Sequence, residues 1–416
     1  MPDVSFTNLL VICAVAVAAP LLVGFLPWLR IPSVVLEIVA GIVLGPSVLG
    51  WLHVDLPVQI LALFGLAFLL FLAGLEIDTR RLRGRVLVLA GAGYLITLVL
   101  GGLAGVGFHT AGWVGQPLLL AIALSATSLG LVVPVLKDAG IVDGAVGQTA
   151  IAAASVADFA AIVLLSLFFS TSGGTTGAKI VFLVAFAAVV AATGVTVAAA
   201  GRSRRLGDVL IRLQDSTAEI RVRFAVVLLV AFTALAERFG LESILGAFLA
   251  GAVVAMVDRD ATSHPHFRTK LEAIGYGFLV PVFFIASGVR LDLRDLLSHP
   301  SALARVPLFL LALLVVRGVP ALLSLRTAGP RATAAIGLLQ ATSLPFIVTA
   351  TQIGIELGRL SATTGAALVC AGLLSVLLFP PFALALLRDD SSDGAGAKPL
   401  PAARSRSRST STPAAP

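Results

Sequence analysis

Long apolar stretches joined by short polar connections make up almost the whole chain, and this pattern restricts its fold more than any other feature. Thirteen stretches reach roughly 20 residues, the length that crosses a hydrocarbon core. Their approximate limits are 7–29, 34–50, 57–75, 86–108, 116–136, 147–170, 178–200, 222–238, 241–257, 271–289, 304–325, 331–352 and 362–387. Only 12% of the residues are charged, whereas a soluble domain has about 25%. The sequence predicts an all-α polytopic membrane protein in a lipid bilayer.

The basic residues predict the orientation in the membrane. With the N-terminus outside, 22 lysines and arginines fall in the inner loops and the tail, 6 fall in the outer loops, and Arg317 lies within a stretch. The positive-inside rule then places the N-terminus outside and the C-terminus in the cytoplasm. We expect the protein to lie in the plasma (inner) membrane. The net charge of +7 reflects this distribution, so no nucleic-acid partner is expected. Residues 1–388 are predicted to form the transmembrane domain, and 389–416, rich in Ser, Ala, Pro and Arg, a disordered tail.

A repeated tetrapeptide indicates that the chain contains two related halves. Ala-Thr-Ser-Leu occupies 126–129 and recurs 215 residues later at 341–344. The segments 74–80 and 288–294 share Gly, Asp and Arg at an offset of 214. This displacement covers seven apolar stretches, an odd number, so the halves would cross the membrane in opposite directions. Inverted-topology repeats of this kind are found in many secondary transporters.

Both copies of the tetrapeptide lie within apolar stretches and beside residues that weaken helices. Small hydroxyl residues next to Gly or Pro can bond to freed backbone groups. We therefore predict two discontinuous helices that cross near the midplane and expose carbonyl groups to a cation. The candidate ion-binding residues at these breaks are Thr127, Ser128, Gln340, Thr342 and Ser343. The alternative is a pair of continuous helices with ordinary Ser/Thr contacts.

Asp158 is the only ionisable residue between Asp143 and Lys179 and lies deep in its stretch. A carboxylate at that depth is costly and by default marks an ion or proton pathway. When ionised it is a hard oxygen ligand that suits a small monovalent cation, and Ser155, one helical turn earlier, could add an oxygen. At the repeat offset, the residue that corresponds to Asp158 in the second half is Leu373, so only the first half would carry a deep carboxylate. The alternative is a protonated Asp158 hydrogen-bonded to a neighbouring helix.

Arg317 is the other deeply placed charge. We expect a charge-compensating, structural role, in which its guanidinium neutralises carbonyl ends at the crossing or pairs with a carboxylate such as Asp158. The glycine-rich segments 41–45 and 101–105 are predicted to be faces where helices pack closely.

Four segments together with Asp158 resemble the monovalent cation:proton antiporter superfamily, on the branch that contains Kef-type and NapA-type proteins. They are EIVAGIVLGPSVLGW at Glu37–Trp51, FLLFLAGLEID at Phe68–Asp78, GLESILGAFLA at Gly240–Ala250 and VPVFFIASGVR at Val280–Arg290. The resemblance covers roughly residues 10–388 and implies the thirteen-helix fold of that family. It also implies a mobile, ion-translocating core (about 86–170 and 304–387), which moves like an elevator around Asp158. The remaining helices (about 7–75 and 178–289) would form a scaffold that makes a homodimer.

The chain departs from these relatives at two positions. Electrogenic NapA-like members carry a second carboxylate immediately before the matching aspartate, where this chain has Ala157. Their intramembrane lysine matches Arg317, which does not release a proton. Both differences favour the exchange of one proton per cation. Kef-type members carry Gln at the Ala157 position and a nucleotide-binding domain after the last helix, for which the segment after Arg388 is too short.

The sequence thus predicts a transporter that exchanges Na⁺ or K⁺ for H⁺ by competition at Asp158, with a role in pH homeostasis and without a cofactor. One alternative is a Kef-like potassium efflux system regulated by a separate subunit. Another is an organic-anion symporter on the same architecture. An enzyme is not expected, because all five histidines lie in loops and no nucleophile constellation accompanies them.

Overall fold

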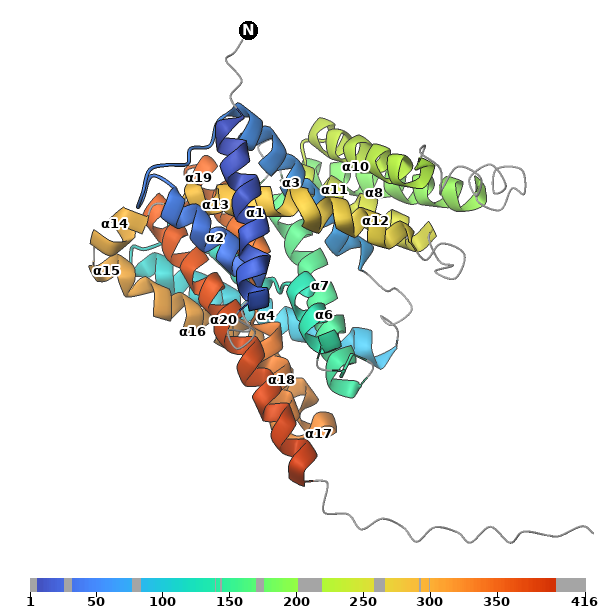
Figure 1. Cartoon of the computed structure of the whole chain (residues 1–416). Helices are drawn as coiled ribbons and strands as arrows, with labels where there is room; N and C mark the ends of the chain where they lie inside the picture. The colour runs from blue at the N-terminus through green and yellow to red at the C-terminus, as the bar shows by residue number, and fades with distance from the viewer. Residues whose placement is uncertain are drawn as a thin grey trace, which may run out of the picture.

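The computed structural model describes residues 6–25, 32–76, 84–138, 140–142, 144–169, 176–200, 219–257, 266–291, 293–298 and 300–393. All regular secondary structure in the described residues is helical, with no strand (Figure 1). Nine helical segments of the described residues are long and apolar enough to cross a membrane, some of them joining two or more of the helices named below, and three shorter apolar helices accompany them. The prediction of an all-α chain is confirmed, while the count of thirteen stays a prediction.

The helices follow the apolar stretches closely. In the first half they are α1 (Thr7–Phe25), α2 (Ser33–Leu44), α3 (Leu56–Leu75), α4 (Arg85–Thr110), α5 (Pro117–Ser125), α6 (Leu129–Asp138), α7 (Ala145–Phe169) and α8 (Thr176–Ala200). In the second half they are α10 (Ile220–Arg238), α11 (Ser243–Val257), α12 (Phe267–Ile274), α13 (Val280–Val289), α14 (Leu293–Ser298), α15 (Pro300–Leu303), α16 (Arg305–Gly318), α17 (Leu325–Ala328), α18 (Pro330–Gln340), α19 (Pro345–Glu356) and α20 (Ala362–Asp393). A π-helical turn (η2, Gly275–Leu279) joins α12 to α13, and a 3₁₀ turn (η3, Val319–Ser324) joins α16 to α17.

The observed helices differ from the predicted apolar stretches in two places. The short helices α14 and α15 lie between two predicted stretches and were not expected. Helix α20 continues to Asp393, so the backbone just after Arg388 is helical rather than part of a disordered tail. Residues 394–416 of the predicted tail lie outside the described residues, as do Asp78 and Asp292 of the repeated exit segments.

The described helices pack in two groups. In the first group α3 packs on α11 and α13, α2 packs on α13, and α10 packs on α11. In the second group α4 packs on α5 and α7, while α16 and α18 pack on α20. Figure 1 shows α8, α10, α11 and α12 on one side and α16, α18 and α20 on the other, with α7 near the centre. The groups meet along fewer contacts, among them α7 with α11 and α14 with α20.

Glycines bring backbones together within the first group. A Cβ atom on Gly41 of α2 would lie 2.2 Å from the Ile285 carbonyl oxygen of α13, and one on Gly288 of α13 would lie 2.2 Å from the Ile38 oxygen of α2. In the second group, a Cβ on Gly105 of α4 would lie 2.3 Å from the Pro117 oxygen of α5. Such close crossings require glycine, so the packing role predicted for both glycine-rich segments is confirmed.

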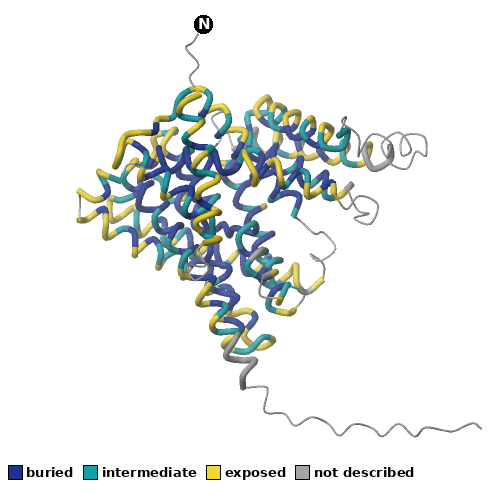
Figure 2. Tube along the Cα trace, viewed as in Figure 1, coloured by how far each residue is buried: buried dark blue, intermediate teal, exposed yellow. Residues whose placement is uncertain are grey.

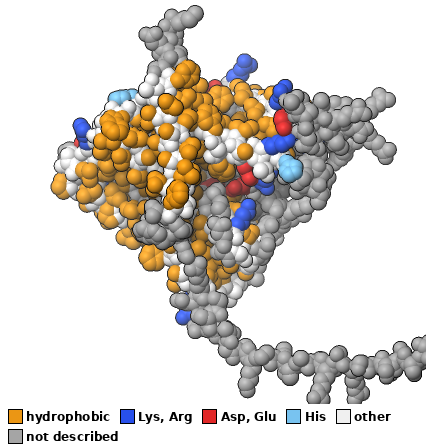
Figure 3. All heavy atoms as spheres, viewed as in Figure 1, with side chains coloured by type: hydrophobic (Ala, Val, Ile, Leu, Met, Phe, Trp, Pro, Cys, Tyr) orange, Lys and Arg blue, Asp and Glu red, His pale blue; other side chains and the backbone are white. Residues whose placement is uncertain are grey.

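The surface is apolar and the centre contains polar groups, as expected for a protein in lipid. Leu10, Val17 and Phe25 of α1 are more than half exposed, and Figure 3 shows hydrophobic side chains over most of the visible face. Buried segments cross the middle of the molecule (Figure 2). Most of the buried polar side chains belong to the second helix group, and they gather around the two repeated tetrapeptides.

Candidate ion-binding site

Two helices are interrupted at the repeated tetrapeptides. Helix α5 ends at Ser125 and α6 begins at Leu129, while α18 ends at Gln340 and α19 begins at Pro345. The two interruptions contact each other directly, because the Ser128 N–H donates to the Thr342 carbonyl at 3.0 Å and the Leu344 N–H donates to the Ser128 hydroxyl at 3.1 Å. The alternative of two continuous packed helices is therefore wrong.

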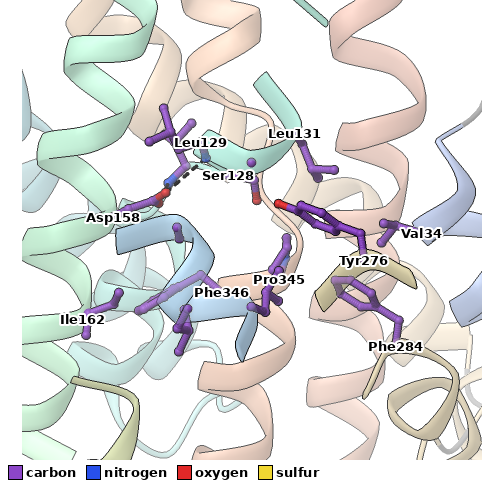
Figure 4. Close-up of a pocket in the computed structure, with 15 residues that line it drawn as sticks. Val34, Ser128, Leu129, Leu131, Asp158, Ile162, Tyr276, Phe284, Pro345 and Phe346 are labelled. Atoms are coloured by element: carbon purple, nitrogen blue, oxygen red, sulfur yellow. Dashed lines mark hydrogen bonds between the residues drawn. The ribbon is translucent and has the colours of Figure 1, made fainter. Parts of the chain in front are cut away.

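Asp158 lies beside the first interruption. It is carried by α7, is 9% exposed, and accepts hydrogen bonds from two backbone N–H groups. Thr127 donates to Oδ1 at 3.2 Å and Leu129 donates to Oδ2 at 3.1 Å (Figure 4). Because Leu129 is the first residue of α6, the carboxylate satisfies donors that a helix N-terminus leaves unpaired and sits at the positive end of the helix dipole. This arrangement explains how a carboxylate can be held at this depth.

A cavity of about 60 Å³ adjoins the carboxylate. Thr127, Ser128 and Asp158 line one side, and Tyr276 and Phe284 of the first helix group line the other (Figure 4). A water needs about 10–15 Å³, so the cavity can hold one small ion with a few waters. The described residues contain no cluster of three or more His, Cys, Asp or Glu side chains that could hold a metal ion. One carboxylate beside a hydroxyl oxygen suits a proton or a monovalent cation.

Arg317 is 2% exposed and binds the end of α18. Its Nε donates to the Thr127 hydroxyl at 2.8 Å and to the Gln340 carbonyl at 3.4 Å, and its Nη1 donates to the Thr97 hydroxyl at 3.2 Å. A second contact joins Nη2 to the Thr127 hydroxyl. The Gln340 carbonyl belongs to the last residue of α18, the negative end of that helix. The guanidinium thus binds the carbonyl end of α18, and its charge-compensating role stays a prediction.

Thr127 stands between the two deep charges. Its N–H donates to Asp158, while its hydroxyl accepts from Arg317 and donates to the Gln340 carbonyl at 2.7 Å. The hydroxyl predicted to bind a cation is therefore engaged by protein atoms. Thr342 is similar, since its hydroxyl donates to the Leu338 carbonyl at 3.1 Å.

The structure brings only part of the predicted set to the cavity. Asp158, Ser128 and Thr127 line it, whereas Ser155, Gln340, Thr342 and Ser343 do not. Ser155 is buried one turn before Asp158 on α7. The Ser343 hydroxyl is buried and has no hydrogen-bond partner among the described residues.

Ser375, Thr97 and Tyr276 also belong to this region and were not predicted. The Ser343 N–H donates to the Ser375 hydroxyl of α20 at 3.2 Å, so Ser375 supports the second interruption as Asp158 supports the first. The repeat offset pointed to Leu373, two positions away. Tyr276 directs its hydroxyl toward Ser128 across the cavity (Figure 4). The only signal in the sequence is that each is a polar residue in an apolar stretch.

Comparison with known families decides where the chain belongs. The family described as "Sodium/hydrogen exchanger, transmembrane" matches residues 13–385. The chain belongs to this family. Its place in the monovalent cation:proton antiporter superfamily is thus confirmed, whereas its place on the Kef/NapA branch stays a prediction.

Relatives of this family member carry related names. The Bacillus subtilis protein named "Putative Na(+)/H(+) antiporter YjbQ" is 32% identical over 91% of this chain and 63% of its own length. The chain therefore spans less than two thirds of that relative. The "Na(+)/H(+)-K(+) antiporter GerN" of Bacillus cereus is 27% identical over 84% of this chain and 88% of its own length.

A solved structure shares the fold. The sodium proton antiporter MjNhaP1 of Methanocaldococcus jannaschii superimposes with a TM-score of 0.64 over 92% of this chain and 98% of that chain, at 17% identity.

Proposed function

We propose that this family member exchanges Na⁺ or K⁺ for H⁺ across a membrane by competition at Asp158. One observation carries the proposal: a buried carboxylate, held by two backbone N–H groups at a helix break, faces a small cavity. The names of the relatives support cation/proton exchange.

Asp158 would hold either a proton or a cation. When it is ionised, its carboxylate supplies the charge, and Ser128, which also lines the cavity, can supply a neutral oxygen. The two backbone N–H groups keep the carboxylate in place in both states and prevent it from turning away from the cavity. Binding of one species then excludes the other, which is the requirement for exchange.

Alternating access would arise from movement of the second helix group against the first. The cavity supports this view, because Asp158 and Ser128 belong to one group and Tyr276 and Phe284 to the other. In this proposal the N-terminus is outside, the halves form an inverted repeat of thirteen helices, and the first group forms a homodimer in the inner membrane.

Exchange would be electroneutral. Asp158 is the only carboxylate among the described residues that line the cavity, its neighbour Ala157 carries no proton, and Arg317 stays charged within its hydrogen bonds. The site would carry one positive charge in each direction. A valinomycin-clamped potential should therefore leave the steady-state ion gradient unchanged, whereas each uncompensated charge would feel about 2.3 kcal/mol per 100 mV. A gradient that follows the potential would contradict electroneutrality.

The exchange itself is tested with purified protein in liposomes that carry a pH gradient. Addition of Na⁺ or K⁺ should dissipate the gradient in the native protein and not in Asp158→Asn; the series Li⁺, Na⁺, K⁺ and Rb⁺ would give the selectivity. Asp55→Asn is the matched control, because Asp55 caps α3 through Val58 N–H at 3.1 Å and asparagine caps equally well. Retained exchange in Asp158→Asn would refute the site.

The same assay separates the alternatives. A Kef-like efflux pathway would pass K⁺ without coupled proton movement. An organic-anion symporter would need more room than the cavity of about 60 Å³ offers, so cation/proton exchange is favoured over it.

A further inference from the structure

A second cavity, of about 420 Å³ and open to the surface, lies at the C-terminal end of α13. It is formed by the connection from α2 to α3 and by the segment that leaves α13, and its polar lining residues are Ser47, His53, Arg290 and Arg294. Along the helix from Tyr276 to Arg290 the chain advances 14 residues, or about 21 Å. This basic cavity is therefore at the C-terminal end of α13, beyond Phe284, which lines the cavity beside Asp158.

The walls of the basic cavity are held by a hydrogen-bond frame. The Ser47 hydroxyl donates to the Leu291 carbonyl at 2.7 Å and accepts from the Leu293 N–H at 3.2 Å. Arg294 donates from Nε to the Ser47 carbonyl at 2.9 Å. One edge of the Arg294 guanidinium thus binds the frame, which fixes its direction, and no described residue binds its two terminal nitrogens.

The charge of the basic cavity is not balanced by the described carboxylates around it. The Arg290 side chain makes no hydrogen bond or ion pair with a described residue. Asp55 is occupied by Val58 N–H and by the Asn8 amide at 2.9 Å, and Asp295 accepts from Thr363. Two guanidinium groups and an imidazole therefore face one space, and guanidinium forks match the oxygens of a phosphate.

The surroundings of the basic cavity indicate the source of the phosphate. Val48, Leu49 and Trp51, on the same connection, are 47%, 44% and 71% exposed. Tryptophan and exposed aliphatic side chains beside a basic group are typical of the level where lipid headgroups meet the acyl region. In Figure 3 basic and histidine side chains lie at the upper left rim of the hydrophobic face.

We propose that the basic cavity binds the phosphate of an anionic phospholipid headgroup, with Arg290 and Arg294 as its ligands and the acyl chains beside Trp51. The proposal does not depend on the transport function. Its consequence is a lipid-dependent stability of the part of the molecule in which α2, α3 and α13 pack together.

The test measures the apparent melting temperature of delipidated protein in detergent during titration with phosphatidylglycerol, phosphatidylcholine or inorganic phosphate. Phosphatidylglycerol should raise the melting temperature and phosphatidylcholine should not. In Arg290→Gln the half-maximal lipid concentration should rise at least about tenfold, the change expected from one lost charge-assisted hydrogen bond. Arg359→Gln, a change at an exposed arginine on another connection, should respond as the native protein.

Arg290→Gln is preferred because its side chain has no described protein partner, so the frame built on Ser47 stays intact. An equal lipid response in Arg290→Gln and native protein would refute the site. A lower melting temperature of Arg290→Gln without lipid, with an unchanged lipid response, would show that the arginine only neutralises the carbonyl ends of α2 and α13. Stabilisation by inorganic phosphate at the same concentrations would assign the cavity to free phosphate instead.

Discussion

Thr127 connects more of the candidate site than any other single residue. Its N–H holds Asp158, and its hydroxyl joins Arg317 to the carbonyl end of α18. The residue therefore fixes the relative positions of the carboxylate, the guanidinium and both interruptions. We infer that its hydroxyl supports the site and does not serve as a cation ligand.

Thr127→Val should lower the apparent melting temperature. The change leaves the buried Arg317 and the Gln340 carbonyl each one partner short, at a cost of about 1–3 kcal/mol. Thr127→Ser keeps the hydroxyl and should remain close to native. Thr110→Val is the control, since the exposed Thr110 hydroxyl only bonds back to Gly107 within α4. Equal losses in the Ser and Val variants would show that the methyl group, rather than the hydroxyl, matters.

The residues of the site were largely predictable, but their partners were not. Asp158 stood out because an isolated carboxylate in an apolar stretch needs a reason, and the tetrapeptides stood out because they repeat. The direction of a side chain at a helix break depends on local dihedral angles and on the facing helix, so spacing could not show that the Thr127 hydroxyl points to Gln340. Ser375 was missed because the sequence does not show that α20 packs on the second interruption, which brings Ser375 next to Ser343.

At the scale of helices, apolar length predicted position well and irregular turns poorly. The stretch predicted at 57–75 became α3 at Leu56–Leu75, because a span is set by the thickness of the hydrocarbon. The π-helical turn before α13 and the 3₁₀ turn after α16 depend on how neighbours crowd the backbone, and their sequences contain no single residue that requires them. A proline alone does not predict a helix break, since Pro20 lies inside the continuous helix α1.

The crossing of α3 and α11 should not tolerate a methyl group. A Cβ on Gly251 of α11 would lie 1.9 Å from the Phe71 carbonyl oxygen of α3, so Gly251→Ala must separate the two helices. We expect loss of the monodisperse peak in size-exclusion chromatography. Gly102→Ala is the control, because no atom lies within 4 Å of its Cβ position and alanine favours a helix by about 1 kcal/mol. A native elution profile for Gly251→Ala would contradict this crossing.

At the scale of the whole molecule, the two helix groups are joined by polar contacts at one end. The Gln352 amide of α19 donates to the Ser287 hydroxyl of α13 at 3.0 Å, and the Glu242 N–H donates to the Ser166 hydroxyl of α7 at 3.0 Å. The cavity beside Asp158 lies on the N-terminal side of Ser287, where Tyr276 and Phe284 line it. These contacts should favour the present arrangement over one in which the two groups close the cavity between Asp158 and Tyr276.

Gln352→Ala should shift the equilibrium toward the opposite arrangement. One net hydrogen bond contributes about 0.5–1.5 kcal/mol, a change of roughly 2- to 12-fold in the population ratio. The shift can be read from the rate at which a thiol reagent modifies Leu131→Cys, which lines the cavity, in a background without Cys13 and Cys370. The rate should fall in Gln352→Ala and stay unchanged in the control Gln59→Ala, at an exposed glutamine of α3. An unchanged rate in Gln352→Ala would show that the contact does not bias the arrangement.

The glycine crossings of the first helix group have a mechanical consequence. Where α2 meets α13, and where α3 meets α11, peptide backbone touches peptide backbone, so no layer of side chains is available to yield under load. Close-packed interiors have low compressibility, and these crossings leave still less slack. A force applied to α3 or α13 would therefore move the first helix group as one rigid unit. Relative sliding would occur at the boundary between the two groups, where longer side chains separate them.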